Sequence, residues 1–234
     1  MRRHNFRFYM HYRARHDVSI EARHAAFTEK MMKLPEPLGW QEIDVPPAPD
    51  CGDELGASFE VSYPTADLEL DGRYVYRGES YHSDDESTYD DKVWITFVPK
   101  NLKISYPAML REHLPRAMSA FEGYAGHGYF GGYVVKYEDL HADEIQSLQN
   151  KPGIDVNGRN NIFTLNVVQY WDAELCQRAL GFGRDEVIRR LNGKVSLVKP
   201  LMDGVYIVFN DNPDLTFEEF CAVNDRFKPI LGIV

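Results

Sequence analysis

Apolar and polar residues alternate near the start of the chain. In residues 5–12 one face of an extended segment would carry Phe6, Phe8, Met10 and Tyr12, and the other Arg7, Tyr9 and His11. This period of two predicts a half-buried β-strand. The spacing then becomes helical, with the apolar residues Ile20, Phe27, Met31 and Leu34. Asp17 or Ser19 can cap this predicted helix, and Pro35 and Pro37 end it.

The middle of the chain mixes strand and helix patterns. Residues 44–56 are rich in proline and glycine, which predicts a long irregular connection. Residues 59–63 and 93–98 alternate and predict two more strands. Ser105 begins a predicted helix that Pro115 breaks or restarts. A strand over residues 133–137 and a polar helix over residues 139–149 are expected to follow.

The last third carries the clearest local signals. Residues 162–168 predict a strand, followed by a helix that Asp172 caps and that runs to Leu180, and by a helix over residues 185–191. Asp203 and Gly204 separate two apolar runs, which is typical of a β-hairpin because both residues reach positive φ at low cost. Thr216 and Glu219 form a capping box at the start of a final helix.

This order of elements predicts an α+β protein. We expect a mixed, largely antiparallel sheet or sheets with helices packed on one face, in a single domain over residues 1–234. The order of elements hints at two similar halves, although no residue-level repeat accompanies it.

Charge is unevenly distributed along the chain, which has a net charge of −10. Residues 1–33 have a net charge of +5, residues 34–100 of −12 and residues 101–234 of −3. An acidic field repels nucleic acid and attracts cations or basic proteins. We therefore expect no nucleic-acid partner, and expect the basic residues 2–15 to pair internally with the acidic region.

Five carboxylates crowd residues 84–91, directly before a predicted strand. They are Asp84, Asp85, Glu86, Asp90 and Asp91, with Tyr81 and Tyr89 beside them. An EF-hand calcium loop is excluded, because the sixth position from Asp84 is Tyr89 rather than glycine and the twelfth is Ile95 rather than glutamate. A solvated loop, a looser divalent-metal site and a surface that meets a basic partner remain open.

Local motifs of catalysis are missing from the sequence. There is no nucleophile elbow, phosphate-binding Walker loop, HExxH helix or kinase signature, so we expect no enzymatic activity and no cofactor. His11 and His16 lack nearby third and fourth ligands, so we expect no metal. Cys51, Cys176 and Cys221 have no paired spacing and predict reduced thiols. Without a long apolar segment, we expect a cytoplasmic protein with no membrane contact.

Residues 126–131, GHGYFG, satisfy the dinucleotide-binding pattern GxGxxG. The context does not fit, because that pattern needs a strand before the glycines and a helix after them, whereas the prediction here is helix, turn, strand. We interpret these residues as a flexible turn. Tyr124, Tyr129 and Phe130 could form an exposed contact loop, because aromatic residues are enriched at interface hot spots.

Both ends of the chain resemble a known family. The opening strand and helix, FRFYMHYRARHDVSIEARHAAFTEKMMKL, and the closing hairpin and helix, PLMDGVYIVFNDNPDLTFEEF, are similar to immunity proteins of bacterial polymorphic toxin systems, and more narrowly to immunity protein family 52. The resemblance implies a non-enzymatic, cytoplasmic α+β protein. Its partner would be a cognate secreted nuclease toxin, such as a type VI secretion effector, which it would bind and neutralise.

On that interpretation the acidic stretch is the candidate partner-binding site. Carboxylates would steer a basic toxin and tyrosines would anchor it. The predicted site comprises Asp84, Asp85, Glu86, Asp90, Asp91, Tyr81 and Tyr89. Two alternatives stay open: a metal-dependent enzyme whose site is assembled from distant residues, and a self-associating structural protein. A homodimer is compatible with each of these functions.

Overall fold

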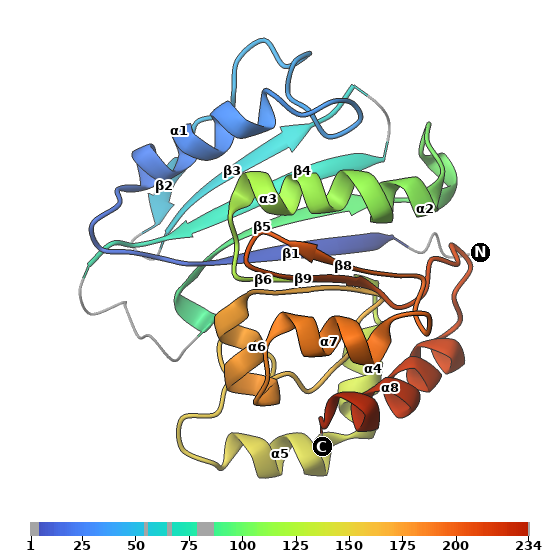
Figure 1. Ribbon diagram of the computed structural model, residues 1–234. Helices are drawn as coiled ribbons and strands as arrows, with labels where there is room; N and C mark the ends of the chain where they lie inside the picture. Colours follow the sequence, from blue (N-terminus) through green and yellow to red (C-terminus); the bar gives the residue numbers. More distant parts are fainter. Residues whose placement is uncertain (1–4, 54–55, 65–66, 79–86, 234) are drawn as a thin grey trace.

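The computed structural model describes residues 5–53, 56–64, 67–78 and 87–233, and its described strands join in one antiparallel sheet (Figure 1). The strand order is β2-β3-β4-β5-β1-β6-β7-β9-β8. The strands are β1 Phe6–Arg13, β2 Asp50–Asp53, β3 Gly56–Ser62, β4 Leu68–Val75, β5 Asp90–Phe97, β6 Ala125–Phe130, β7 Val168–Trp171, β8 Leu197–Leu201 and β9 Gly204–Val208.

Helices pack against both faces of this sheet. They are α1 Ile20–Met31, α2 Tyr106–Ala108, α3 Leu114–Phe121, α4 Tyr133–Leu140, α5 Ala142–Gln149, α6 Ala173–Leu180, α7 Arg184–Leu191 and α8 Phe217–Leu231. In Figure 1, α1 and α3 lie above the strands, and α6, α7 and α8 lie below them. No helix within the described residues is long and apolar enough to cross a membrane.

Two apolar clusters account for this arrangement. On the first face, Phe6, Phe8 and Met10 of β1 are fully buried in a cluster with residues of α1 and α3. On the second face, Trp171 of β7 and Ile207 of β9 belong to another cluster with residues of α6, α7 and α8. The α+β class and the antiparallel sheet are therefore confirmed. The prediction that helices pack on one face holds for α1 and α3. Helices α6–α8 pack on the opposite face, at the other end of the sheet.

Strongly capped elements form as the local signals predict. The side chain of Ser19 accepts a hydrogen bond from the Ala22 N–H at 3.1 Å and begins α1. Both hydrogen bonds of the capping box between Thr216 and Glu219 are present at the start of α8. Strands β8 and β9 pair across the predicted hairpin turn. These features need only neighbouring residues, which is why sequence patterns predict them.

Two predictions near the glycine-rich motif are wrong, a strand over residues 133–137 and a flexible turn over residues 126–131. Residues 133–137, expected as a strand, belong to helix α4, and the strand is β6, which contains most of the GHGYFG motif. Gly126 and Gly128 lie on the covered face of β6, where an added Cβ would meet the rings of Phe8 and Phe6. Glycine stands at the positions where apolar side chains would mark the buried face. The alternation of apolar and polar residues that predicts a strand is therefore lost from the sequence.

Strand β4 was not predicted, for a related reason. Its covered face carries Leu68, Leu70, Gly72 and Tyr74. A Cβ on Gly72 would lie 2.1 Å from the ring of Phe59, its cross-strand neighbour. Two smaller differences follow: the connection predicted over 44–56 contains the short strand β2, and the strand predicted over residues 162–168 begins only at Val168.

Pro115 does not end its helix, because the chain widens into a π-helical turn over Met109–His113 and continues into α3. Proline lacks the N–H that would bond the carbonyl of Arg111, four residues earlier. That carbonyl instead accepts a hydrogen bond from Lys199 Nζ at 3.0 Å, and the neighbouring Leu110 carbonyl accepts one from the Tyr206 hydroxyl at 2.6 Å. Strands β8 and β9 thus satisfy the freed carbonyls.

The packing of β6 predicts that Gly128 is needed for stability. In the G128A variant the new methyl group would lie 2.7 Å from Phe6 Cζ, so we expect a loss of about 1–3 kcal/mol in the free energy of unfolding. In G131A the nearest atom is 3.7 Å away, so this variant serves as the matched control. Urea denaturation measures both. Equal stabilities for the two variants would contradict this account of β6.

Candidate functional site

The predicted acidic site divides between described and undescribed residues. Tyr81, Asp84, Asp85 and Glu86 lie outside the described residues. Tyr89 is half-buried at the end of a short 3₁₀ turn, and Asp90 and Asp91 follow it as the first residues of β5. Asp90 is 1% exposed and Asp91 is 0% exposed. The expectation that these two carboxylates face a partner is therefore wrong, because both are buried in ion pairs.

Asp90 joins three separate parts of the chain. Arg159 donates to its Oδ1 from Nε at 2.8 Å and lies at 2.7 Å through Nη2. The hydroxyl of Tyr124 donates to Oδ2 at 2.6 Å, and Nδ1 of His11 lies 3.3 Å from the same oxygen. A buried charge is tolerated only when it is paired and hydrogen-bonded in this way. His11 itself is 9% exposed.

Asp91 is held by a second arginine. Arg77 donates to both carboxylate oxygens, at 2.9 and 2.8 Å, and the Val75 N–H donates to Oδ1 at 3.0 Å. Burial raises the pKa of Asp91, and the hydrogen bonds and charge of Arg77 oppose that rise. The expected internal pairing of the basic N-terminal residues is present in part: His11 contacts Asp90, while Arg13 pairs with Asp172 at 2.6 Å.

The open face of the sheet brings other side chains together. Cross-strand register places Glu60, Asp71, Trp94, Tyr9 and His127 in one row across β3, β4, β5, β1 and β6. The next row adds Glu69 and Tyr129 on the same face. Glu60 and Glu69 are exposed and the other five are half-buried. Helices α1 and α3 cover the opposite face, so this one meets solvent. We call these seven residues the aromatic–acidic face.

Stacked rings form the centre of this face. The ring of Tyr9 stacks with those of Trp94 at 5.7 Å, His127 at 5.4 Å and Tyr129 at 5.8 Å between centroids. Burial, together with the nearby charges of His11 and Lys92, lowers the pKa of His127 well below its ordinary value. Neutral His127 therefore continues the aromatic row at physiological pH. The rings are already ordered, so a partner that covers them loses little side-chain entropy.

Carboxylates gather at the β3–β4 side of the same face. Burial raises the pKa of Asp71, and Glu60 and Glu69 raise it further, while Arg7 opposes them. The basic residues Arg73 and Lys92 lie one row away, opposite Ser58 and His11 in the register. The face is therefore polarised, with an acidic corner, an aromatic centre and a basic row.

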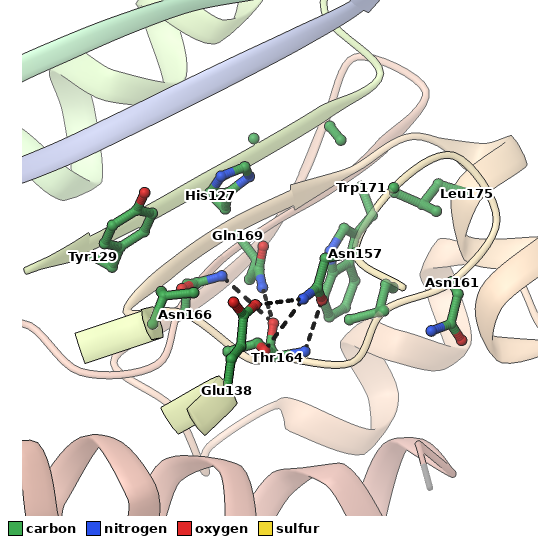
Figure 2. Close-up of a pocket in the computed structure, with 15 residues that line it drawn as sticks. His127, Tyr129, Glu138, Asn157, Asn161, Thr164, Asn166, Gln169, Trp171 and Leu175 are labelled. Atoms are coloured by element: carbon green, nitrogen blue, oxygen red, sulfur yellow. Dashed lines mark hydrogen bonds between the residues drawn. The ribbon is translucent and has the colours of Figure 1, made fainter. Parts of the chain in front are cut away.

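A small cavity adjoins the aromatic–acidic face at β6 and β7 (Figure 2). Its volume is about 140 Å³, and its polar lining includes His127, Tyr129, Glu138, Asn157, Thr164, Asn166 and Gln169. Asn157 fixes the loop that closes it: its Oδ1 accepts from the N–H groups of Phe163 at 2.9 Å and Thr164 at 2.8 Å. Gln169 Nε2 donates to the Thr164 carbonyl at 3.0 Å. The cavity is thus walled by a sheet on one side and a tightly bonded loop on the other.

Three other predictions can be compared with the structure: the cysteines, a metal site and the aromatic contact loop. Cys176 is a buried free thiol whose pKa is raised by burial to about 12, which disfavours the reactive thiolate. The described part of the chain has no group of three His, Cys, Asp or Glu residues placed to hold a metal ion. Of the aromatic residues expected in a contact loop, Tyr129 lies on the open face, whereas Tyr124 and Phe130 are 4% and 1% exposed.

Sequence patterns alone do not identify the aromatic–acidic face. Tyr9 was predicted to lie on the face of its strand opposite Phe6 and Phe8, and that is confirmed. Its neighbours Trp94 and His127 come from distant strands, and only the register places them beside it. Knowledge of strand order was the missing information.

Comparison with known proteins identifies a similar fold. No family model matches the chain, and no curated protein matches its sequence. Among solved structures, the Pseudomonas aeruginosa T6SS protein PA0821 is similar with a TM-score of 0.50 at 13% identity. The match covers 97% of this chain and 74% of that protein. At this identity the likeness concerns the fold.

The Asp90 contacts predict a large effect from a small change. In the D90N variant, Arg159 loses the buried carboxylate of Asp90 as an ion-pair partner, so we expect the free energy of unfolding to fall by roughly 3–5 kcal/mol. The control is D17N, which disrupts the exposed pair of Asp17 with Arg15 and should change stability little. Guanidinium denaturation measures both. Comparable stabilities for D90N and D17N would show that the buried pair is unimportant.

Proposed function

We propose that this protein is a non-enzymatic immunity protein that acts in the cytoplasm, where it binds and neutralises a cognate secreted nuclease toxin. The observation that carries the proposal is the aromatic–acidic face, a sheet surface on which stacked aromatic rings lie beside the carboxylates of Glu60, Glu69 and Asp71. The fold likeness to a T6SS protein and the net charge of −10 are consistent with it.

Charge complementarity supports this kind of partner. A nuclease that holds phosphates needs a cationic groove, and an acidic protein can occupy or flank such a groove. Complementary fields raise association rates by about 10–10³-fold. The acidic corner of Glu60, Glu69 and Asp71 would steer the toxin to this face.

The aromatic centre would supply most of the binding energy. Interface hot spots are enriched in tryptophan and tyrosine near the middle of the contact. Trp94 and Tyr9 occupy that position on the face, between the acidic corner and β6. Polar residues around them would form the rim that excludes water.

Only some residues of the acidic stretch remain in the proposed binding site. Tyr81, Asp84, Asp85, Glu86 and Tyr89 remain candidate contacts, because they precede β5 directly in the sequence. Asp90 and Asp91 are excluded from the proposed binding site, because both are buried and paired with arginines.

Substitutions on the face should impair protection without unfolding the protein. We expect W94A to weaken toxin binding by about 2 kcal/mol, roughly 30-fold in Kd, because a central aromatic anchor is lost. The double variant E60K/E69K should slow association by removing the steering field. Survival of bacteria that express the adjacent gene product, and association rates of the purified pair, measure both effects.

A matched charge change elsewhere controls for net charge. E174K/D185K reverses two exposed carboxylates on α6 and α7, outside the aromatic–acidic face, and should leave protection intact. Full protection by both W94A and E60K/E69K would reject this face as the binding site. An adjacent product that is harmless, or toxic but not neutralised by the unaltered protein, would reject the immunity function itself.

A further inference from the structure

Hydrogen-bond acceptors are in excess in the cavity beside the aromatic–acidic face. Asn166 is 6% exposed, and its Oδ1 has no hydrogen-bond partner among the described residues. Its amide nitrogen already points to the Thr164 carbonyl, at 3.5 Å, which orients the free oxygen. An unmade hydrogen bond at a buried acceptor is costly, so the cavity wall at Asn166 is under-satisfied in the free protein.

Glu138 adds negative charge to the same cavity. Its carboxylate accepts a hydrogen bond from Asn157 Nδ2 at 3.2 Å, and no ion pair to Glu138 is formed within the described ranges. Burial raises the pKa of Glu138, with a further contribution from Asp139. A cation placed beside the Glu138 carboxylate would favour its charged form. It would thereby offset the cost of burial and the repulsion from Asp139.

Aromatic rings form flat walls at the mouth. The rings of His127 and Tyr129 are nearly parallel, with 6° between their planes and 5.8 Å between centroids. Figure 2 shows both on β6, across from Glu138 and Asn166. A planar guanidinium stacks on such faces and donates hydrogen bonds at its edges, whereas an ammonium matches this geometry less well.

The size of the cavity limits its occupant. A volume of about 140 Å³ accommodates one side chain, and it is below the roughly 300–1,000 Å³ of ordinary small-molecule sites. Because the cavity shares His127 and Tyr129 with the aromatic–acidic face, a protein that covers the face could insert a side chain here.

We propose that this cavity receives one arginine side chain of the protein partner. The guanidinium would donate to the Glu138 carboxylate and would stack against Tyr129 or His127. This inference rests on the proposed function, because it names how a basic partner is recognised at the end of the aromatic–acidic face. The cavity would contribute to specificity, because a partner with an arginine at the matching position would bind more tightly.

An arginine analogue tests the pocket without the toxin. The full-length protein is titrated with N-acetyl-L-argininamide, and the indole resonance of Trp171, which lines the cavity, is followed by NMR. We expect a saturable shift. The neutral isostere N-acetyl-L-citrullinamide should bind at least about tenfold more weakly, because hydrogen bonds between charged groups are the stronger ones.

Two variants locate the binding. E138Q should weaken binding of the arginine analogue at least about tenfold, whereas E144Q, which removes an exposed carboxylate on α5, should bind like the unaltered protein. Absence of a saturable shift, equal binding of the citrulline analogue, or unchanged binding by E138Q would overturn the inference. The outcome is independent of toxin neutralisation, so a failed survival assay with intact arginine binding would contradict only the immunity function.

Discussion

The buried carboxylate of Asp90 organises the junction between the two ends of the sheet. Arg159, from the loop after α5, reaches across 69 residues of sequence to pair with it, and Tyr124 and His11 bond the same group. A second contact, from the Ser87 N–H to Asp155 Oδ2 at 2.8 Å, binds that loop to the segment before β5. Because an unpaired buried charge is expensive, the loop has to remain on the sheet. The cavity beside β6 exists because the loop is held there.

The placement of helices determines which surface is free to bind. Helices α1 and α3 cover one face of the sheet and α6–α8 cover the other face at the far end, which leaves the second face of β3, β4, β5 and β1 open. Two carboxylates of the acidic middle region, Asp90 and Asp91, are buried in ion pairs inside the protein. A count of charges along the sequence therefore overstates the acidity of the surface, and burial decides which carboxylates remain for a partner.

The success of each sequence-based prediction depends on how local its signal is. The first strand, the Ser19 cap, the capping box of Thr216 and the hairpin at Asp203 all follow from adjacent residues. Strands β4 and β6 were missed because glycines on their covered faces make room for aromatic rings from neighbouring strands, which erases the apolar alternation. The candidate site was the least predictable part, because the pairing of Asp90 with Arg159 and of Tyr9 with Trp94 depends on strand order and loop placement.

The central claim is that the aromatic–acidic face is the surface that meets a protein partner. Hydroxyl-radical footprinting of the free protein and of its complex with the adjacent gene product tests it most directly, with Met202, 39% exposed at the distant β8–β9 turn, as the internal reference. The account predicts that Trp94, Tyr9 and Tyr129 become protected in the complex while Met202 oxidises at the same rate. Unchanged oxidation of the three aromatic residues in an intact complex would contradict it.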